Sequence, residues 1–545
     1  MNSLTLLLLG ILLFLVAYAT YGAYLAKHWG IDNERKTPAH TCRDDIDYCP
    51  ANAKVLLGHH FSSIAGAGPI TGPIAAAIFG WLPVYLWIVI GSIFVGGVHD
   101  WGSLFASIRH DGKSIGEIIR VNIGARGKML FNIFAYLTLV LVVAAFTDIC
   151  ASTFAFDPAK PELLSGARAG TASILFIFLA MAFGFFVYRK GANLTLSSII
   201  GVALLFFSIW IGYQFPILKL TKFEWDVVLI VYIFAASTMP VWFLLQPRDY
   251  LCSFLLYAML AGAVIGILIV RPAMAIPASV GFTIGEGVKA QYLFPMLFVT
   301  VACGAISGFH SLVGSGTSSK QLSTEKDTKL VGYGAMLIEG ILAIIALITV
   351  GYVVGAKGTP AQIFAGGVSD FMSNFGIPVS IGTVFVILAF SAFALTSLDT
   401  ATRLGRYLFQ EMTARADGKK SILNNMYVAT AITVGLSALL LSYGYQKIWP
   451  IFGSANQLLA GLSLLAVSAW LAKSGKKNFM TVIPMVFMFA VTLTALILVG
   501  RNNFASGNFI IGSVAAILFV LAIILIVTTI NTFFGKKSEK KNISA

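Results

Sequence analysis

Three acidic residues, Asp100, Asp148 and Glu339, lie inside long apolar segments of the chain. A carboxylate is costly inside a membrane, so such residues usually face an interior pathway. Glu339 lies near the middle of its segment and Asp100 toward an inner end, whereas Asp148 is close enough to an outer end to reach the interface. Because burial favours the neutral form of a carboxyl group, we expect Asp100 and Glu339 to carry a proton. The alternative is a pair of buried carboxyl groups with a structural role.

Several histidines fall at a similar depth. His59 and His60 lie at one inner end, His99 adjoins Asp100, and His310 lies toward the inner end of another segment. Histidine titrates near neutral pH, so a His/Asp group on the cytoplasmic side could relay a proton or sense pH. For each histidine taken singly, a hydrogen bond to backbone at a helix break is an equal alternative.

Residues 58–73 contain four glycines and two prolines, too many for a continuous helical hydrogen-bond ladder. A broken helix at membrane depth offers carbonyl groups to a cation and a half-helix N-terminus to an anionic group. A second break is predicted at residues 236–240, where Pro240 interrupts an apolar run. The expected substrate-binding residues at the two breaks are Ser62, Ser63, Gly66, Gly68 and Thr238. A kinked packing helix is the alternative for 58–73.

Hydroxyl groups also gather at the end of the apolar segment 291–314. Ser307 and Ser311 could contribute to ion coupling as cation ligands or could simply pack helices, and both interpretations stay open. In the segment 448–471, Asn456 and Gln457 are expected to form hydrogen bonds between helices rather than a site.

Composition identifies the environment of these groups. The chain has 545 residues, of which 58% are hydrophobic and only 11% charged, less than half the share of about 25% in soluble domains. Soluble enzymes, nucleic-acid-binding domains and disordered chains are excluded, which leaves an all-α polytopic membrane protein in a lipid bilayer. The net charge of +14 is typical of the positive-inside bias, and no nucleic-acid partner is expected.

Fifteen apolar segments are long enough to be membrane spans. They are 3–25, 56–79, 82–108, 128–150, 171–188, 194–213, 227–245, 250–270, 291–314, 330–355, 378–397, 426–443, 448–471, 479–499 and 509–534. Most Lys and Arg residues fall in alternate connections if the N-terminus is outside and the C-terminus cytoplasmic. The cytoplasmic connections then include 246–249 and 398–425. The first segment could instead be a cleaved signal peptide, but it lacks a basic N-terminal region.

The two predicted breaks are five spans apart and enter the membrane from opposite sides, which favours a five-plus-five inverted repeat. The predicted parts are an N-terminal span and cytoplasmic loop (1–55), repeat one (56–213), repeat two (227–397) and accessory helices (426–545). The alternative is that Gly and Pro are simply common in membrane helices.

Two of the five cysteines, Cys42 and Cys49, share the first loop with His40. A lasting disulfide is not expected in the cytosol. These residues could hold a metal ion such as zinc, but their spacing matches no common zinc motif, so free thiols are favoured.

The sequence contains no HExxH or Walker A motif. We therefore expect no enzyme activity, no cofactor and no nucleotide-driven pumping.

Several stretches resemble the carbon starvation protein A family. They are GHHFSSIAGAGPITGP (58–73), MPVW (239–242), QPRDY (246–250), GFHSLVGSGT (308–317), TSLDTATR (396–403) and FGSANQ (452–457). The resemblance implies a bacterial inner-membrane uptake system with a LeuT-like inverted-repeat fold, induced when preferred carbon runs out. It also implies a small carboxylate-bearing substrate, a peptide for some members and pyruvate with protons for others.

The resulting hypothesis is a secondary active importer that works by alternating access, with H⁺ as the coupling ion. Na⁺ coupling through hydroxyl and carbonyl oxygens is an alternative. A membrane nutrient sensor is a further alternative, although the chain has no large cytoplasmic signalling domain, and a channel is a third. The nutrient itself and the oligomeric state are left open by the sequence.

Overall fold

The computed structural model describes residues 2–44, 48–159, 164–240, 243–285, 290–413 and 421–542. Apart from a short antiparallel pair, β1 (Thr283–Ile284) and β2 (Gln291–Tyr292), the regular elements described are helical. The helices of the first half are α1 (Ser3–Ala19), α2 (Tyr21–Trp29), α3 (Pro38–Thr41), α4 (Ala53–Ile64), α5 (Gly68–Ala76), α6 (Trp81–Gly91), α7 (Gly97–Ile108), α8 (Ile115–Asn122), α9 (Ala125–Phe154), α10 (Ser165–Gly184), α11 (Leu194–Gln214), α12 (Lys222–Thr238) and α13 (Leu245–Val270). Those of the second half are α14 (Leu293–Val301), α15 (Gly308–Gly316), α16 (Ala335–Gly351), α17 (Pro360–Ser373), α18 (Val379–Thr413), α19 (Met426–Leu441), α20 (Tyr445–Lys473), α21 (Phe479–Ala505) and α22 (Phe509–Asn542).

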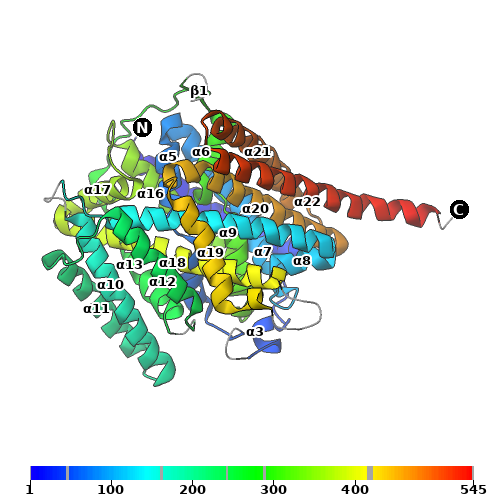
Figure 1. The fold of residues 1–545 in the computed structure, drawn as a ribbon, viewed down its shortest axis with the longest axis horizontal. Helices are drawn as coiled ribbons and strands as arrows, with labels where there is room; N and C mark the ends of the chain where they lie inside the picture. The colour runs from blue at the N-terminus through cyan, green and yellow to red at the C-terminus, as the bar shows by residue number, and fades with distance from the viewer. Residues whose placement is uncertain are drawn as a thin grey trace.

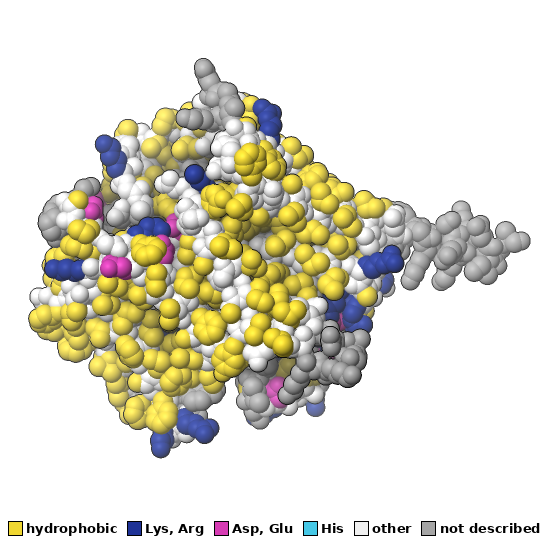
Figure 2. Space-filling model, in the orientation of Figure 1, with side chains coloured by type: hydrophobic (Ala, Val, Ile, Leu, Met, Phe, Trp, Pro, Cys, Tyr) yellow, Lys and Arg dark blue, Asp and Glu magenta, His cyan; other side chains and the backbone are white. Residues whose placement is uncertain are grey.

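The protein is an all-α polytopic membrane protein. Twelve helical segments of the described chain are long and apolar enough to cross a membrane, or thirteen if the bent pair formed by α4 and α5 counts as one span. Figure 2 shows hydrophobic side chains over most of one face, with Lys and Arg mainly toward its edges. Such a surface is stable against lipid rather than water.

Fifteen spans were predicted, whereas twelve or thirteen segments of the described chain meet the length and composition of a spanning helix. The two surplus segments correspond to α12, with 17 residues, and α19, with 16. Each is apolar and lies where a span was predicted, but is shorter than a typical spanning helix, which needs about 20 residues. An apolar run in the sequence continued past the residues that are actually helical.

The first predicted helix break is confirmed. Helix α4 ends at Ile64, α5 begins at Gly68, and the pair is bent by 48°. Glycine is required on the far side of the break, because a Cβ added at Gly72 would collide with the backbone carbonyl of Val301 in α14. The break therefore lets α5 pack directly on a second interrupted helix.

The second break was predicted at the wrong place. Pro240 follows the end of α12 at Thr238, and the next helix, α13, begins at Leu245. Proline lacks a backbone N–H, so here it ends a helix instead of interrupting a span. The second interrupted span is α14–α15, in which a 3₁₀ turn at Ala302–Gly304 separates the two halves.

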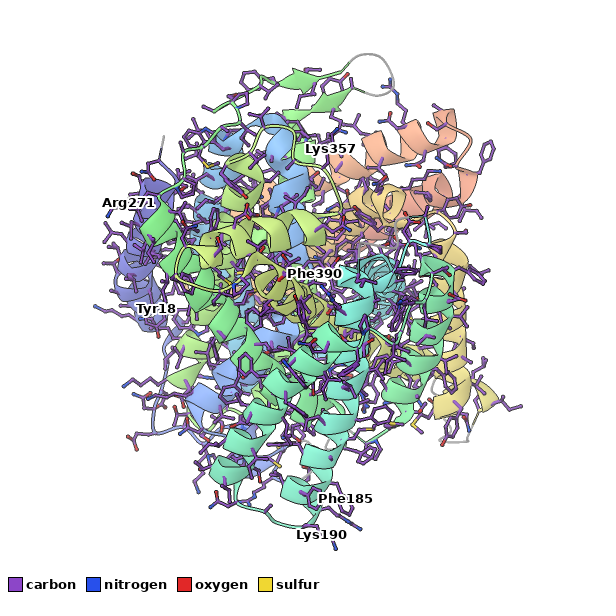
Figure 3. All side chains as sticks on the ribbon, turned by 90° about the vertical axis from the view of Figure 1, so that its left-hand side faces the viewer. Tyr18, Phe185, Lys190, Arg271, Lys357 and Phe390 are labelled. Atoms are coloured by element: carbon purple, nitrogen blue, oxygen red, sulfur yellow. The ribbon has the colours of Figure 1, made fainter. Side chains whose placement is uncertain are left out.

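Helix α9 crosses the middle of the molecule and packs along α18 and α20 (Figure 1). The α10–α11 hairpin forms one edge, and α21 and α22 form the other. Figure 3 places Lys190, in the hairpin connection, at the opposite end of the molecule from Lys357, with Phe390 of α18 between them. Most residues of α5 and α15, the second halves of the two interrupted spans, are buried, so these halves lie in the interior of the helical bundle.

Candidate functional site

His310 lies between two carboxylates among α7, α15 and α16. Its Nδ1 is 2.8 Å from Asp100 Oδ2, and its Nε2 is 3.5 Å from Glu339 Oε2. None of the three residues is more than 3% exposed. Both carboxylate oxygens of Glu339 are buried and lack a hydrogen-bond partner among the described residues. Asp100, His310 and Glu339, which the sequence placed at different depths, therefore form one continuous buried chain of titratable groups.

Close helix packing brings Asp100 to this position. The turn before α7 is a π-helix, Ser92–Gly96, and a Cβ added at Gly96 would collide with the carbonyl of Ala305 next to α15. A Cβ at Gly97 would meet the ring of Tyr333, 2.6 Å away. Small residues at these positions let α7 approach both the second break and the turn that leads into α16.

His310 is positioned by the start of α15, which is tied to α20. Asn456 Oδ1 accepts a hydrogen bond of 2.9 Å from Phe309 N, and Asn456 Nδ2 donates to Ser307 Oγ at 3.0 Å. The hydroxyls of Ser311 and Ser463 are 2.8 Å apart. The expectation of interhelical hydrogen bonds from Asn456 is confirmed. Ser307 and Ser311 are engaged in helix packing in this conformation.

The remaining histidines divide between two places. His99 Nδ1 lies 2.6 Å from Asp100 Oδ1, so Asp100 contacts two imidazoles. His60 Nδ1 lies 2.7 Å from Ser318 Oγ at the end of the second interrupted span. His59 departs from the expected group, because its Nδ1 lies 3.8 Å from Asp249 Oδ2 on α13. Consecutive residues of α4 therefore contact different polar clusters.

The second cluster is built around Arg248, which is 1% exposed. Its Nη1 donates to Asp399 Oδ2 at 2.5 Å and also to the hydroxyl of Tyr232. The Tyr232 hydroxyl donates to the same Asp399 oxygen at 2.8 Å. The arginine and the carboxylate are thus paired in the interior of the helical bundle and bridged by a tyrosine from α12.

Sequence reasoning quoted the stretches that contain Arg248, Asp249 and Asp399 but assigned these residues no role. It placed them in the connections 246–249 and 398–425, whereas α13 begins at Leu245 and α18 continues to Thr413. Charged residues were taken as the ends of apolar runs, although here they pair with one another inside the helices. One signal in the sequence could have indicated this pairing: Arg248 and Asp399 carry opposite charges and each lies at the end of an apolar run.

The break between α4 and α5 adjoins this second cluster. Ser397, two residues before Asp399 on α18, donates from Oγ to the carbonyl of Ser63 at 3.2 Å. The hydroxyl of Ser62 is buried and has no partner among the described residues. Gly66 and Gly68 are needed for close approach, since a Cβ would meet Ser397 Oγ at 2.5 Å and Cys303 Cβ at 2.6 Å respectively.

Thr238 is the last residue of α12 and does not lie at a break within a span. Its hydroxyl donates to the carbonyls of Phe234 and Ala235 in the last turn of α12. Arg403 covers the same helix end, where Nη2 donates to the carbonyls of Ala236 and Met239. Because Pro240 does not interrupt a span, Thr238 is separated from the four other residues predicted to bind substrate.

Asp148 does not extend to a polar surface, as its position near a segment end had indicated. It is 1% exposed, and its Oδ1 lies 2.5 Å from Lys222 Nζ. Its Oδ2 accepts a hydrogen bond of 2.7 Å from the backbone N of Tyr445, the first residue of α20. The carboxylate therefore joins α9, α12 and α20.

The sequence profile described as "Carbon starvation protein CstA" matches residues 2–356 and 351–495. The chain belongs to the carbon starvation protein CstA family. The peptide transporter CstA of Bacillus subtilis is 32% identical over 97% of both chains. The peptide transporter CstA of Escherichia coli is 32% identical over 91% of this chain and 80% of the relative. The pyruvate/proton symporter BtsT of Escherichia coli is 31% identical over 91% of this chain and 81% of the relative.

Solved structures of LeuT-fold transporters are similar to this CstA-family protein. A mutant of the Eremococcus coleocola manganese transporter superposes with a TM-score of 0.50 at 13% identity, over 90% of this chain and 98% of that one. MhsT in complex with L-phenylalanine gives a TM-score of 0.49 at 13% identity, over 87% of this chain and 99% of that one. The family profile and the named relatives, and not these structures, identify the protein as a secondary transporter of the CstA family and not an enzyme.

The first loop of this family member gives no support to a metal site. Cys42 and Cys49 are not joined by a disulfide. Across the described ranges, no group of three or more His, Cys, Asp or Glu side chains is placed to hold a metal ion. His40 lies on the short helix α3 with its side chain exposed.

Proposed function

We propose that this protein imports a small carboxylate-bearing nutrient, a short peptide or pyruvate, together with protons. The observation that supports proton coupling best is the buried chain Asp100–His310–Glu339, whose Glu339 oxygens have no hydrogen-bond partner among the described residues. The names of the relatives supply the two substrate classes. The proposed location is the bacterial inner membrane, with the N-terminus outside and the C-terminus in the cytoplasm.

The imidazole of His310 gives this chain a way to couple protonation to movement. When both ring nitrogens carry a proton, His310 can donate to Asp100 on α7 and to Glu339 on α16. When one proton leaves, one of these two connections loses its hydrogen bond. Since His310 lies in the second half of an interrupted helix, a change in protonation alters how that half is held by its neighbours.

The substrate in this proposal binds at the break between α4 and α5, near Ser62, Ser63, Gly66 and Gly68. The bent backbone frees polar groups there, and the unpartnered hydroxyl of Ser62 is available to a ligand. A small void of about 10 Å³ remains there, lined by residues that include Thr71, Thr153 and Tyr445.

The arrangement of helices supports a revised inverted repeat. We propose that one repeat runs from α4 to α13 and the other from α14 to α20, so that each begins with an interrupted helix. Helices α9 and α18 then correspond and pack on each other, and the short helices α12 and α19 also correspond. The α10–α11 hairpin is an insertion in the first repeat, and α21 and α22 remain accessory helices.

Uptake into proteoliposomes tests the proposed function. Labelled pyruvate and labelled dialanine are each offered with an inward proton gradient, an inward sodium gradient, or neither. Accumulation of one substrate only with the proton gradient is the expected result. Accumulation driven by sodium alone would move the coupling site to hydroxyl and carbonyl oxygens such as those of Ser397 and Ser63. Binding without accumulation would favour the nutrient sensor, and transport that never exceeds equilibrium would favour a channel.

A further inference from the structure

The guanidinium of Arg248 uses only one of its ends for the contacts within its cluster. Nη1 donates to Asp399 and to Tyr232. Nε and Nη2, which lie together on another edge of the planar group, are buried and have no hydrogen-bond partner among the described residues. Two parallel N–H groups on one edge of an arginine match the two oxygens of a carboxylate.

Burying two N–H groups without acceptors is costly in free energy. The unpaired Nε and Nη2 of Arg248 therefore point to a bound ligand, or to another conformation in which these groups find an acceptor. A second carboxylate lies close to this edge: Asp249 Oδ1 is 3.7 Å from Arg248 Nη2 and is itself buried without a hydrogen-bond partner among the described residues. Asp249 also has a second neighbour, because its Oδ2 lies 3.8 Å from His59 Nδ1. Asp249 can therefore turn to His59 when another carboxylate occupies the Arg248 edge.

The other carboxylate of the cluster does not prevent an anion from binding. Asp399 accepts hydrogen bonds from both Arg248 and Tyr232. Arg403 lies one turn further along α18 and adds a second positive charge near Asp399. It is 8% exposed, and its Nη2 donates hydrogen bonds to two backbone carbonyl groups. The negative charge of Asp399 is thus compensated from two directions.

The location of the Arg248 edge agrees with a role in substrate recognition. Helix α4, which ends at the break, packs on both α13 and α18. The side chain of Asp249 interacts with those of Ser63 and Thr396, and Ser397 donates to the Ser63 carbonyl. An anion on the free edge of Arg248 would lie beside the break that the proposed function assigns to the substrate.

We propose that Nε and Nη2 of Arg248 bind the carboxylate of the transported nutrient. This inference rests on the proposed function for the class of substrate, since a peptide C-terminus and pyruvate share a carboxylate. Binding displaces Asp249 toward His59, so the arrival of substrate changes a contact of α4. The residue after His59, His60, contacts Ser318 at the end of the second interrupted span, which links the two spans. The same edge discriminates against neutral analogues, because an amide cannot accept two charge-assisted hydrogen bonds.

The test measures binding to the purified full-length protein without any ion gradient. Isothermal titration compares pyruvate with pyruvamide, and dialanine with its C-terminal amide. We expect wild-type protein to prefer at least one of the two acids over its amide. Arg248→Gln should reduce the affinity for that acid by roughly 10- to 100-fold and remove the preference over the amide. Arg248→Lys keeps the positive charge but not the two parallel N–H groups, and should give an intermediate loss of affinity for the acid.

Two further variants keep the test decisive. Arg168→Gln is the matched control, because Arg168 packs on the ring of Tyr213, 4.2 Å from its centroid, outside the Arg248 cluster; its acid preference should equal that of the wild type. If Arg248→Gln fails to fold because Asp399 is left unpaired, the double variant Arg248→Gln/Asp399→Asn removes both charges and should also lose the preference.

The possible outcomes separate this inference from the proposed function. A folded Arg248→Gln or double variant that still prefers the acid to the same degree would overturn the role of Arg248, even if wild-type protein accumulates substrate with protons. Loss of preference in those variants, with no proton-driven accumulation by wild type, would support Arg248 and reject the coupling proposal. Wild-type protein that binds neither acid would overturn this inference together with the proposed substrate class.

Discussion

His310 Nε2 lies 3.5 Å from Glu339 Oε2, although the two residues belong to different spans and no other polar group of the described chain hydrogen-bonds that carboxylate. In the proposed mechanism, a proton shared between these two groups would hold the second interrupted helix to α16, and its loss would weaken that connection. The relationship makes Glu339 the first residue at which to test coupling.

Glu339→Gln removes the titrating group but keeps its size. We expect uptake driven by a proton gradient to fall at least about tenfold, because a charge-assisted hydrogen bond contributes roughly 1.5–3 kcal/mol. Exchange of labelled for unlabelled substrate, which needs no net proton movement, should continue. Asp148→Asn, at a buried carboxylate outside this chain, is the control and should keep gradient-driven uptake. Full accumulation by Glu339→Gln would remove this residue from the coupling mechanism.

Asp100→Asn should affect transport for a different reason. Asp100 contacts His99 through one oxygen and His310 through the other, so the substitution weakens two connections of α7 at once. We expect both lower uptake and a flatter dependence of uptake on pH, measured between about pH 5 and 8. Initial uptake rates across this range are the measurement. A variant with the wild-type rate and pH profile would show that Asp100 has no part in coupling.

Glu325→Gln should lower the thermal stability of the protein. Glu325 is fully buried and pairs with Arg109 through both oxygens, at 2.7 and 2.8 Å, and it accepts a hydrogen bond from the backbone N of Asp32. The substitution leaves Arg109 without a charged partner, which typically costs about 3–5 kcal/mol. Thermal unfolding in detergent is the measurement. An unchanged midpoint would indicate that the first loop does not depend on this ion pair.

Gly72→Ala should destabilise the contact between the two interrupted helices. A Cβ at this position collides with the carbonyl of Val301, which is backbone and cannot move aside as a side chain can. We expect a loss of roughly 1–3 kcal/mol or more. Gly435→Ala is the control, since nothing lies within 4 Å of its added Cβ on α19, and it should be neutral or slightly stabilising. Equal unfolding midpoints for the two variants would contradict the close packing of α5 on α14.

Glu117, in the connection between α7 and α9, predicts a pH effect on stability. Burial alone would raise the pKa of Glu117, but hydrogen bonds from Lys128 and Arg120 lower it below the ordinary value of 4.5. A group with a lowered pKa in the folded state stabilises the protein above its unfolded pKa and loses that contribution as the pH falls. The difference in unfolding midpoint between wild type and Glu117→Gln should therefore be constant near neutral pH and shrink below about pH 4.5. A difference that persists at lower pH would argue against this ionic contribution.

The sequence by itself determined the membrane class, the first helix break and three residues of the titratable chain. These properties are local: an apolar composition requires lipid, a dense group of glycine and proline cannot remain helical, and an acid inside an apolar segment needs an interior partner. Asp100, His310 and Glu339 were recognised from residue type and depth alone.

Only the tertiary structure decided which of these groups meet. Depth along a helix does not give its rotation, so the sequence could not separate His59, which turns to Asp249, from its neighbour His60, which turns to Ser318. The position of the second break likewise depends on how α14 and α15 pack, and not on Pro240. Arg248 and Asp399 looked like the ends of apolar runs because each charge is unfavourable alone, and only the folded chain brings them together to compensate each other.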